Sequence, residues 1–251
     1  MKIQFIVCGW WYDEFDGKKG VTDFIEQLNE LKNENDFIDV FYSCHKEPPN
    51  IIKDNFNWKL FENVGLEWGA YDKACNHLNL DKDTFIFFIQ DDMFVRDWSF
   101  ITKCVEVLSK GEVKVIGNGV TYPIDYVREE NKWRYDTSMF TLGVRGSFFA
   151  TKKEHFDTIG GFDYVQTPIT YGKKEDGTEF LLTDPFGNTT MYLNSYKFTK
   201  FLGQNSIRYL SKVYRNSEWM LECGRGQSLL EELDGRHKKD FESFPEELIL
   251  K

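Results

Sequence analysis

Apolar and polar residues alternate along this chain with two periods, one typical of strands and one typical of helices. Short apolar runs predict strands, and longer segments with apolar residues three and four positions apart predict helices. Their alternation over residues 1–120 is typical of a parallel sheet wound with right-handed crossovers. The predicted strands cover residues 2–8, 37–43, 58–64, 113–117 and 140–151 and a run that begins at residue 85; the predicted helices cover 21–32, 68–78, 98–108, 155–159 and 190–202.

One apolar run is followed directly by charged residues. Residues 85–89 read Phe-Ile-Phe-Phe-Ile and are followed by Gln90, Asp91 and Asp92. A continuous run of aromatic and β-branched residues predicts a strand buried on both faces, in the middle of a parallel sheet. Ligands of open α/β sheets bind outside the carboxyl ends of strands, where two acids suit a hard cation and its phosphate ligands. The alternative is a solvated strand end, or a cap for the helix that begins near Asp97.

The composition favours one packed domain. The chain has 251 residues, of which 41% are hydrophobic and 17% aromatic, so it has ample material for a core. We predict a single α/β domain over residues 1–251, with a charged tail at 236–251. The net charge of −10 argues against a general nucleic-acid surface, which needs a basic stripe. No apolar segment approaches the ~18 residues of a membrane span.

The five cysteines are scattered and show no metal-ligand spacing. Their odd number, together with an acidic stretch soon after the first apolar run, favours reduced thiols in a cytoplasmic protein.

Three segments, in this order, resemble the family 2-like glycosyltransferases of the GT-A fold. The first is Asn-Val-Gly at residues 63–65, followed by Ala74 and Asn76. The second is the Gln-Asp-Asp that ends the apolar run. The third is Gly-Ser-Phe-Phe at 146–149, leading to Gly-Gly-Phe-Asp at 160–163. The alternative for the first and third segments is ordinary turn and helix-capping chemistry.

This resemblance implies a Rossmann-related GT-A domain with a nucleotide-sugar-binding half at residues 1–120. It also implies an irregular acceptor-side half at 121–235 and a bound Mn²⁺ or Mg²⁺. Such an ion stabilises the diphosphate that leaves when a sugar is transferred to a hydroxyl of a glycan, lipid-linked sugar or small acceptor. The implied metal ligands are Asp92 and Asp91; the donor-binding residues are Cys8, Trp10, Tyr12, Ser43, Asn63, Gly65, Asn76, Gln90 and Asp91; and the acceptor-side residues are Gly161, Phe162 and Asp163.

The catalytic base departs from the family pattern. The family commonly places Glu-Asp at the start of a helix about 25 residues beyond the Gly-Gly-Phe-Asp segment, and here residues 187–190 contain no acid. Asp184 is the nearest substitute, with Asp163 before it, if an acceptor hydroxyl is to lose its proton to a carboxylate. A non-catalytic nucleotide-sugar or glycan binding module on the same scaffold is therefore the alternative function.

The sequence lacks the motifs of two other enzyme classes. A two-metal nucleotidyl or phosphoryl transferase needs a second acidic set and usually a phosphate-cradling loop, and a dinucleotide oxidoreductase needs GxGxxG. Peripheral contact with a membrane is compatible with a lipid-linked acceptor.

Overall fold

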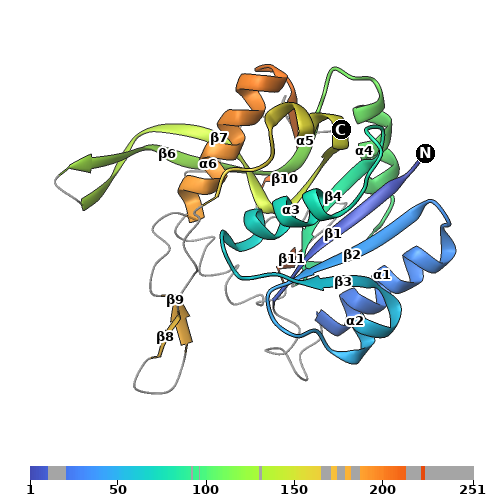
Figure 1. Ribbon diagram of the computed structural model, residues 1–251. Coiled ribbons are helices and arrows are strands. Elements are labelled where there is room, and N and C mark those ends of the chain that lie inside the picture. The colour runs from blue at the N-terminus through green and yellow to red at the C-terminus, as the bar shows by residue number, and fades with distance from the viewer. Residues whose placement is uncertain are drawn as a thin grey trace.

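A large sheet forms the centre of the protein. The computed structural model describes residues 1–10, 21–91, 93–95, 97–129, 132–164, 171–173, 179–181, 187–212 and 222–223. The strands of the large sheet are β1 (Ile3–Gly9), β2 (Ile38–Cys44), β3 (Asn57–Leu60), β4 (Phe85–Gln90), β6 (Val115–Glu129), β7 (Lys132–Lys152) and β10 (Ile207–Lys212). Their order across the sheet is β10-β6-β7-β4-β1-β2-β3 (Figure 1). Only β7 among them runs antiparallel to its neighbours, so the predicted α/β class with a mostly parallel sheet is confirmed.

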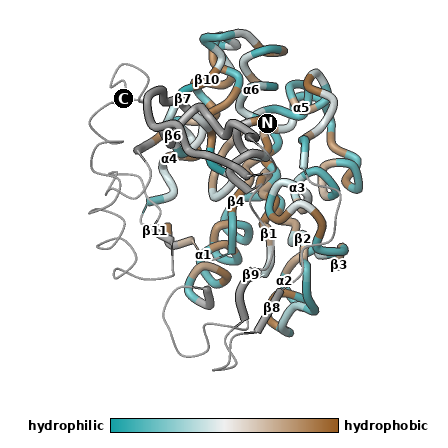
Figure 2. The backbone as a smooth tube through the Cα atoms, turned by 90° about the vertical axis from the view of Figure 1, so that its left-hand side faces the viewer, coloured by the Kyte–Doolittle hydropathy of each residue, from teal (hydrophilic) through white to brown (hydrophobic). Residues whose placement is uncertain are grey.

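Helices cover both faces of this sheet. The helices are α1 (Val21–Glu34), α2 (Asn50–Asn55), α3 (Leu66–His77), α4 (Phe100–Ser109), α5 (Lys153–Ile159) and α6 (Gly187–Leu202). Helices α1, α2 and α4 pack on one face, and α3, α5 and α6 pack on the other (Figure 1). In Figure 2, hydrophobic and hydrophilic residues alternate along α1. Its residues Phe24, Ile25 and Leu28 are buried, as the helical spacing predicts.

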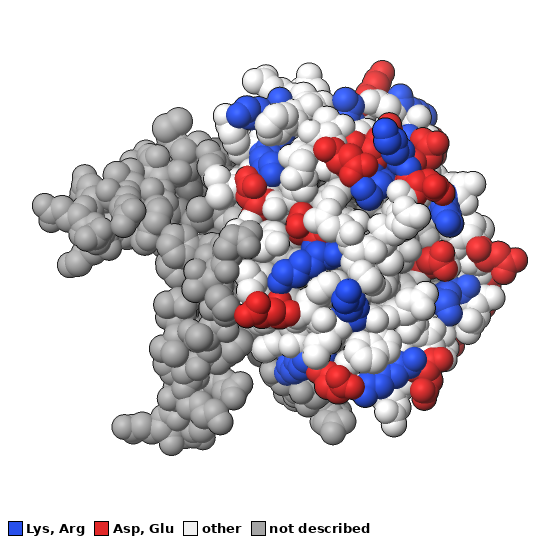
Figure 3. All heavy atoms as spheres, viewed as in Figure 1, with Lys and Arg blue, Asp and Glu red and all other residues white. Residues whose placement is uncertain are grey.

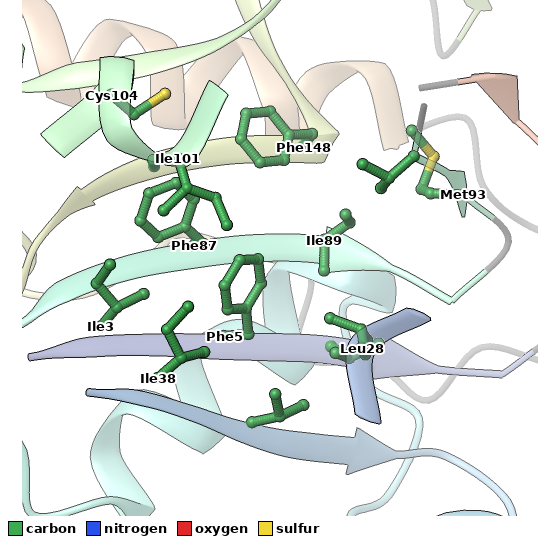
Figure 4. Close-up of a cluster of buried hydrophobic side chains, with 14 of the residues drawn as sticks. Ile3, Phe5, Leu28, Ile38, Phe87, Ile89, Met93, Ile101, Cys104 and Phe148 are labelled. Atoms are coloured by element: carbon green, nitrogen blue, oxygen red, sulfur yellow. The ribbon is translucent and has the colours of Figure 1, made fainter. Parts of the chain in front are cut away.

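Strand β4 lies between β1 and β7 and contributes to both cores. Phe87 and Ile89 join the cluster under α1 and α4, where they lie near Phe5 and Phe148 (Figure 4). Phe88 and its neighbour Ile86 point to the opposite face and join the second cluster. All five apolar residues of β4 are buried, which confirms the predicted central strand.

Most of the β6–β7 hairpin was not predicted. The sequence pattern predicts strands at 113–117 and 140–151, whereas β6 and β7 pair over a longer stretch, from Val115 with Thr151 out to Glu129 with Lys132. Beyond Gly119 the hairpin extends past the sheet as a two-stranded ribbon (Figure 1). Its sequence includes Pro123, next to which the register shifts, and a proline within a run argues against a strand.

Several shorter elements also differ from the prediction. Helix α2 and edge strand β10 carry no strong periodic pattern and were not predicted, and β3 ends at Leu60, earlier than the predicted end at residue 64. Within the acceptor-side half that was expected to be irregular, β8 (Tyr171–Lys173) and β9 (Glu179–Leu181) pair with each other. Late in the chain, β11 (Glu222–Cys223) pairs with β5 (Met93–Phe94), directly after the predicted acids.

No helix among the described residues is long and apolar enough to cross a membrane.

Candidate functional site

The carboxyl ends of β1, β2 and β4 bring together predicted donor-binding residues from distant parts of the sequence. Cys8 pairs in register with both Ser43 and Gln90, so these three residues lie side by side across the sheet. Past these strand ends the backbone of Asp91 still donates to Cys8 O at 3.1 Å. The sheet therefore assembles Cys8, Trp10, Ser43, Gln90 and Asp91 at one edge, the edge at which α/β sheets bind ligands.

Asp91 is fixed at this edge and fully buried. Its Oδ2 accepts a hydrogen bond of 2.8 Å from the backbone N–H of Trp10. The pKa of the nearby Tyr42 hydroxyl is raised, first by burial and then by the negative charges of Asp91 and Cys44. A buried carboxylate loses its hydration, and a cation bound at the strand ends would offset that loss.

Trp10 lies against two residues that follow β2. The His45 ring packs edge-on at 6.2 Å between centroids, and Lys46 Nζ lies 4.5 Å from the centroid of the indole. The backbone N–H of His45 donates to Gly9 O at 3.0 Å, which extends the β1–β2 pairing beyond the strands. Trp10 is only partly buried, so this cluster presents an aromatic ring and a cation at the predicted donor edge.

His45 joins the strand ends to the start of α3. Its Nδ1 lies 3.4 Å from Phe61 O, and its Nε2 lies 3.3 Å from Leu66 O. Burial lowers the pKa of His45, while the two carbonyl groups act in the opposite direction. These contacts with two backbone carbonyls give His45 a structural role, linking the end of β2 to the segment before α3.

We expect acid to destabilise the fold through the two buried histidines. Burial lowers the pKa values of His45 and His155 below the ordinary 6.5, so below that pH the unfolded chain binds more protons than the folded one. The free energy of unfolding should therefore fall as pH is lowered from about 7.5 to about 5.5. Urea unfolding at both pH values checks this for the wild type and for His45→Gln, His155→Gln and the double variant. The double variant should show the weakest dependence, and a wild type that gains stability over this interval would contradict the expectation.

The Asn63–Gly65 segment packs against the residue that follows Gly-Gly-Phe-Asp. Gly65 has φ 84°, in the left-handed region, and a Cβ there would overlap the ring of Tyr164. A Cβ at Gly69, one turn into α3, would overlap Val64 O. Two motifs that are about 100 residues apart in the sequence thus form one contact, and glycine is required at its closest point.

Asn63 has a buried side chain with unused polar atoms. Both Oδ1 and Nδ2 are inaccessible to solvent, and neither forms a hydrogen bond within the described ranges. A buried carboxamide without partners costs free energy, and because solvent does not reach its polar atoms, the predicted donor-binding role of Asn63 would require the surrounding residues to move.

Asn76 lies away from the other predicted donor residues. It stands in the last turn of α3, about 16 Å along the axis from Gly65 at 1.5 Å per residue. Its Nδ2 donates to Asp72 Oδ2 at 3.0 Å. The structure thus places Asn76 in the polar contacts that hold the acceptor-side segment.

The Gly161–Asp163 segment is held by side chains that the sequence did not single out. Asp72 Oδ1 accepts from the backbone N–H of Phe162 at 2.8 Å, beside Gly161 with φ 82°. Burial raises the pKa of Asp72, and that hydrogen bond opposes the shift. Asn194, fully buried on α6, accepts from the N–H of Asp163 and donates to its carbonyl oxygen, both at 2.8 Å. Thr190 and Ser195 are also buried on α6, so the inward side of this helix mixes polar residues with the apolar Phe198 and Leu202.

Phe162 and Asp163, both predicted to line the acceptor side, lie in different environments. The Phe162 ring is buried among other rings and cannot reach an acceptor. The Asp163 carboxylate is half exposed and accepts from Lys197 Nζ at 3.0 Å, and the same ammonium group donates to Gly161 O at 2.7 Å. The Asp163 carboxylate is therefore already engaged by an ammonium group of α6.

Three predicted site residues, Tyr12, Asp92 and Asp184, lie outside the described residues. Within the described ranges, no group of three His, Cys, Asp or Glu residues is placed to hold a metal ion.

Comparisons with known proteins give only distant structural likenesses. Neither a protein-family model nor a curated protein matches the sequence. A mannosyltransferase from Pyrobaculum calidifontis, solved with GDP-Man and Mn²⁺, is 15% identical with a TM-score of 0.41 and covers 64% of this chain. This chain spans about half of that protein, 47% of its length.

Two further structures are similar over more of their length. A 4-diphosphocytidyl-2C-methyl-D-erythritol synthase from Anaerococcus prevotii is 14% identical, covers 95% of this chain and 98% of its own, and has a TM-score of 0.47. A mannose-6-phosphate isomerase from Helicobacter pylori is 9% identical, covers 87% and 99%, and has a TM-score of 0.42. Likenesses at these values do not identify a reaction.

Proposed function

We propose that this protein is a metal-dependent glycosyltransferase that moves a sugar from a nucleotide diphosphate to a hydroxyl acceptor. The observation that supports the proposal most directly is the fully buried carboxylate of Asp91 at the carboxyl end of the central strand, next to Trp10, Ser43 and Gln90. Acids at this edge of a parallel sheet suit a diphosphate and its cation.

The residues present fit Mn²⁺ or Mg²⁺. Such an ion needs only one or two protein carboxylates, with phosphate oxygens and water completing its shell. Asp91 and Asp92 would supply them, with Asp91 held in place by the N–H of Trp10. When bound, the ion stabilises the negative charge of the departing diphosphate. Gln90 contributes no charge, so we expect weak metal binding without the nucleotide.

The remaining residues of the edge would orient the donor. The Trp10 ring, flanked by Lys46, offers a face for the nucleotide base. In the transfer itself, the acceptor oxygen bonds to the anomeric carbon, the bond from that carbon to the diphosphate oxygen breaks, and a carboxylate takes the hydroxyl proton. We assign that carboxylate to Asp184, because Lys197 already pairs with Asp163.

A binding module without turnover is the second candidate. It is favoured by the first turn of α6, which has no acid where the family resemblance predicts one. Donor binding without transfer would follow if no other carboxylate reached the acceptor.

One experiment tests the proposal. The protein is mixed with Mn²⁺ and a panel of sugar nucleotides, and thermal stability and nucleoside diphosphate release are measured. A donor at about 100 times its Kd should add about 2.7 kcal/mol to the free energy of unfolding. Asp92→Ala should abolish this stabilisation, whereas Asp97→Asn, at an exposed acid five positions along, should retain it.

The outcomes separate the candidates. Stabilisation with diphosphate release supports the transferase, and stabilisation alone supports the binding module. No stabilisation by any donor, or stabilisation that survives Asp92→Ala, would refute the metal site.

A further inference from the structure

The outward face of α6 exposes an unusual amount of apolar surface. Leu193, Tyr196 and Phe201 retain 41%, 53% and 49% of their accessible surface. Only three other large hydrophobic residues within the described ranges are exposed, namely Met1, Phe37 and Leu60. The opposite side of α6 is used for packing, because Phe198 and Leu202 are buried in the core. The exposed side chains are therefore not a by-product of a loosely packed helix.

A lysine lies in the middle of these side chains. Lys200 Nζ is 5.9 Å from the ring centroid of Tyr196 and 5.2 Å from that of Phe201. At helical spacing Lys200 lies between Tyr196 and Leu193 around the axis, so the cation is central and not peripheral. We call Leu193, Tyr196, Lys200 and Phe201 the α6 patch. In Figure 3, the surface over the upper part of α6 is mostly white with blue atoms among the white.

The charge of the surrounding sequence is opposite to that of the whole chain. The chain has a net charge of −10, yet residues 187–217 contain neither aspartate nor glutamate. The same segment has five basic residues: Lys197, Lys200, Arg208, Lys212 and Arg215. Lys197 is paired with Asp163, so the charge at the α6 patch itself comes from Lys200. Screening limits the reach of more distant acids to about 8 Å at physiological salt.

The central lysine decides which partner fits. Lysine is depleted from the dry centres of protein interfaces, where aromatic residues are enriched. A second copy of this chain that paired α6 with α6 would bring Lys200 close to its own counterpart, since a two-fold interface joins the same surface on both subunits. Aromatic and aliphatic side chains around a lysine instead match the interface of an anionic bilayer. There the rings enter the headgroup region and the ammonium group meets lipid phosphates.

We propose that the α6 patch is a docking surface for an anionic lipid membrane. Binding is weak and reversible, because one exposed helix face with a single central lysine contributes little compared with a membrane-spanning helix. This surface is separate from the donor edge, so its test does not depend on the proposed transferase activity.

The test is co-sedimentation with lipid vesicles. The full-length protein should sediment with vesicles of equal parts phosphatidylcholine and phosphatidylglycerol, and much less with phosphatidylcholine alone. Lys200→Gln should lower the partition coefficient about 5-fold, the effect of one basic residue near an anionic surface. The double variant Tyr196→Ser, Phe201→Ser should lower it at least as much. Because all three side chains are exposed, thermal unfolding should be unchanged.

Matched controls come from exposed hydrophobic residues outside α6. Phe37→Ser and Leu60→Ser remove side chains that are 41% and 48% exposed but lie outside the α6 patch, and they should sediment as the wild type does. The proposal is overturned if the wild type does not bind the anionic vesicles, or if the controls lose binding as the patch variants do. It is also overturned if analytical ultracentrifugation shows a dimer that the patch variants dissociate while vesicle binding persists.

Discussion

Replacing Phe162 by alanine is expected to lower the free energy of unfolding by about 4 kcal/mol, with the melting temperature falling roughly 8–16 °C. The ring is 5% exposed and lies 5.0–5.5 Å, centroid to centroid, from the rings of Trp68, Phe88, Phe149 and Phe156. Its removal leaves a cavity where strands β4 and β7 meet helices α3 and α5. Urea and thermal unfolding check this result.

Phe37→Ala is the matched control, because the same ring is removed from a position that is 41% exposed. Its effect should stay within about 0.5 kcal/mol. Phe162→Leu should fall between the two, since it keeps most of the apolar volume. If Phe162→Ala left stability unchanged but impaired acceptor use, the ring would have to leave the core, and the packing described above would be wrong.

Asp91→Asn is expected to leave the fold nearly intact and to weaken metal-dependent donor binding about 10–100-fold. The amide oxygen of asparagine can still accept from the N–H of Trp10, but the negative charge is lost. Asp91→Ala removes both the charge and the acceptor, so it should also destabilise the protein by about 1–3 kcal/mol. Titration with Mn²⁺ and a sugar nucleotide, together with urea unfolding, separates the two effects.

Asp97→Asn serves as the control, because Asp97 is an exposed acid whose carboxylate accepts from the N–H and hydroxyl of Ser99. It should leave donor binding unchanged. A full metal-dependent response in Asp91→Asn would show that the charge of Asp91 is not needed, and the metal would then depend on Asp92 alone.

The parts of the fold that were predictable are those with strong periodicity. The spacing of apolar residues alone predicts the buried strand β4 and the amphipathic helix α1. It does not predict the ribbon of β6 and β7, whose residues beyond Gly119 pair with each other on either side of a register shift at Pro123. Strand β10 was missed because its sequence, Ile-Arg-Tyr-Leu-Ser-Lys, mixes polar and apolar residues and contains no continuous apolar run.

The candidate site was predictable only as a set of strand ends. The acids after β4 and the aromatic residue after β1 could be placed at one edge, because parallel strands share an orientation. The anchoring of Gly161–Asp163 by Asp72 and Asn194 joins α3, α6 and the segment that follows α5, and no periodic pattern predicts contacts between elements so distant in sequence. The same limit hid the contact between Gly65 and Tyr164.

The position of β7 has a consequence for synthesis on the ribosome. Strand β4 pairs with β1 on one side and with residues 148–152 of β7 on the other. At 5–20 residues per second, the pairing residues of β7 follow the end of β4 by roughly 3–12 s. During that interval the Phe-Ile-Phe-Phe-Ile edge of β4 has no strand beside it, and an open apolar edge invites pairing with other chains. Fragments that end before residue 148 should therefore aggregate, even though they contain every strand of the donor edge.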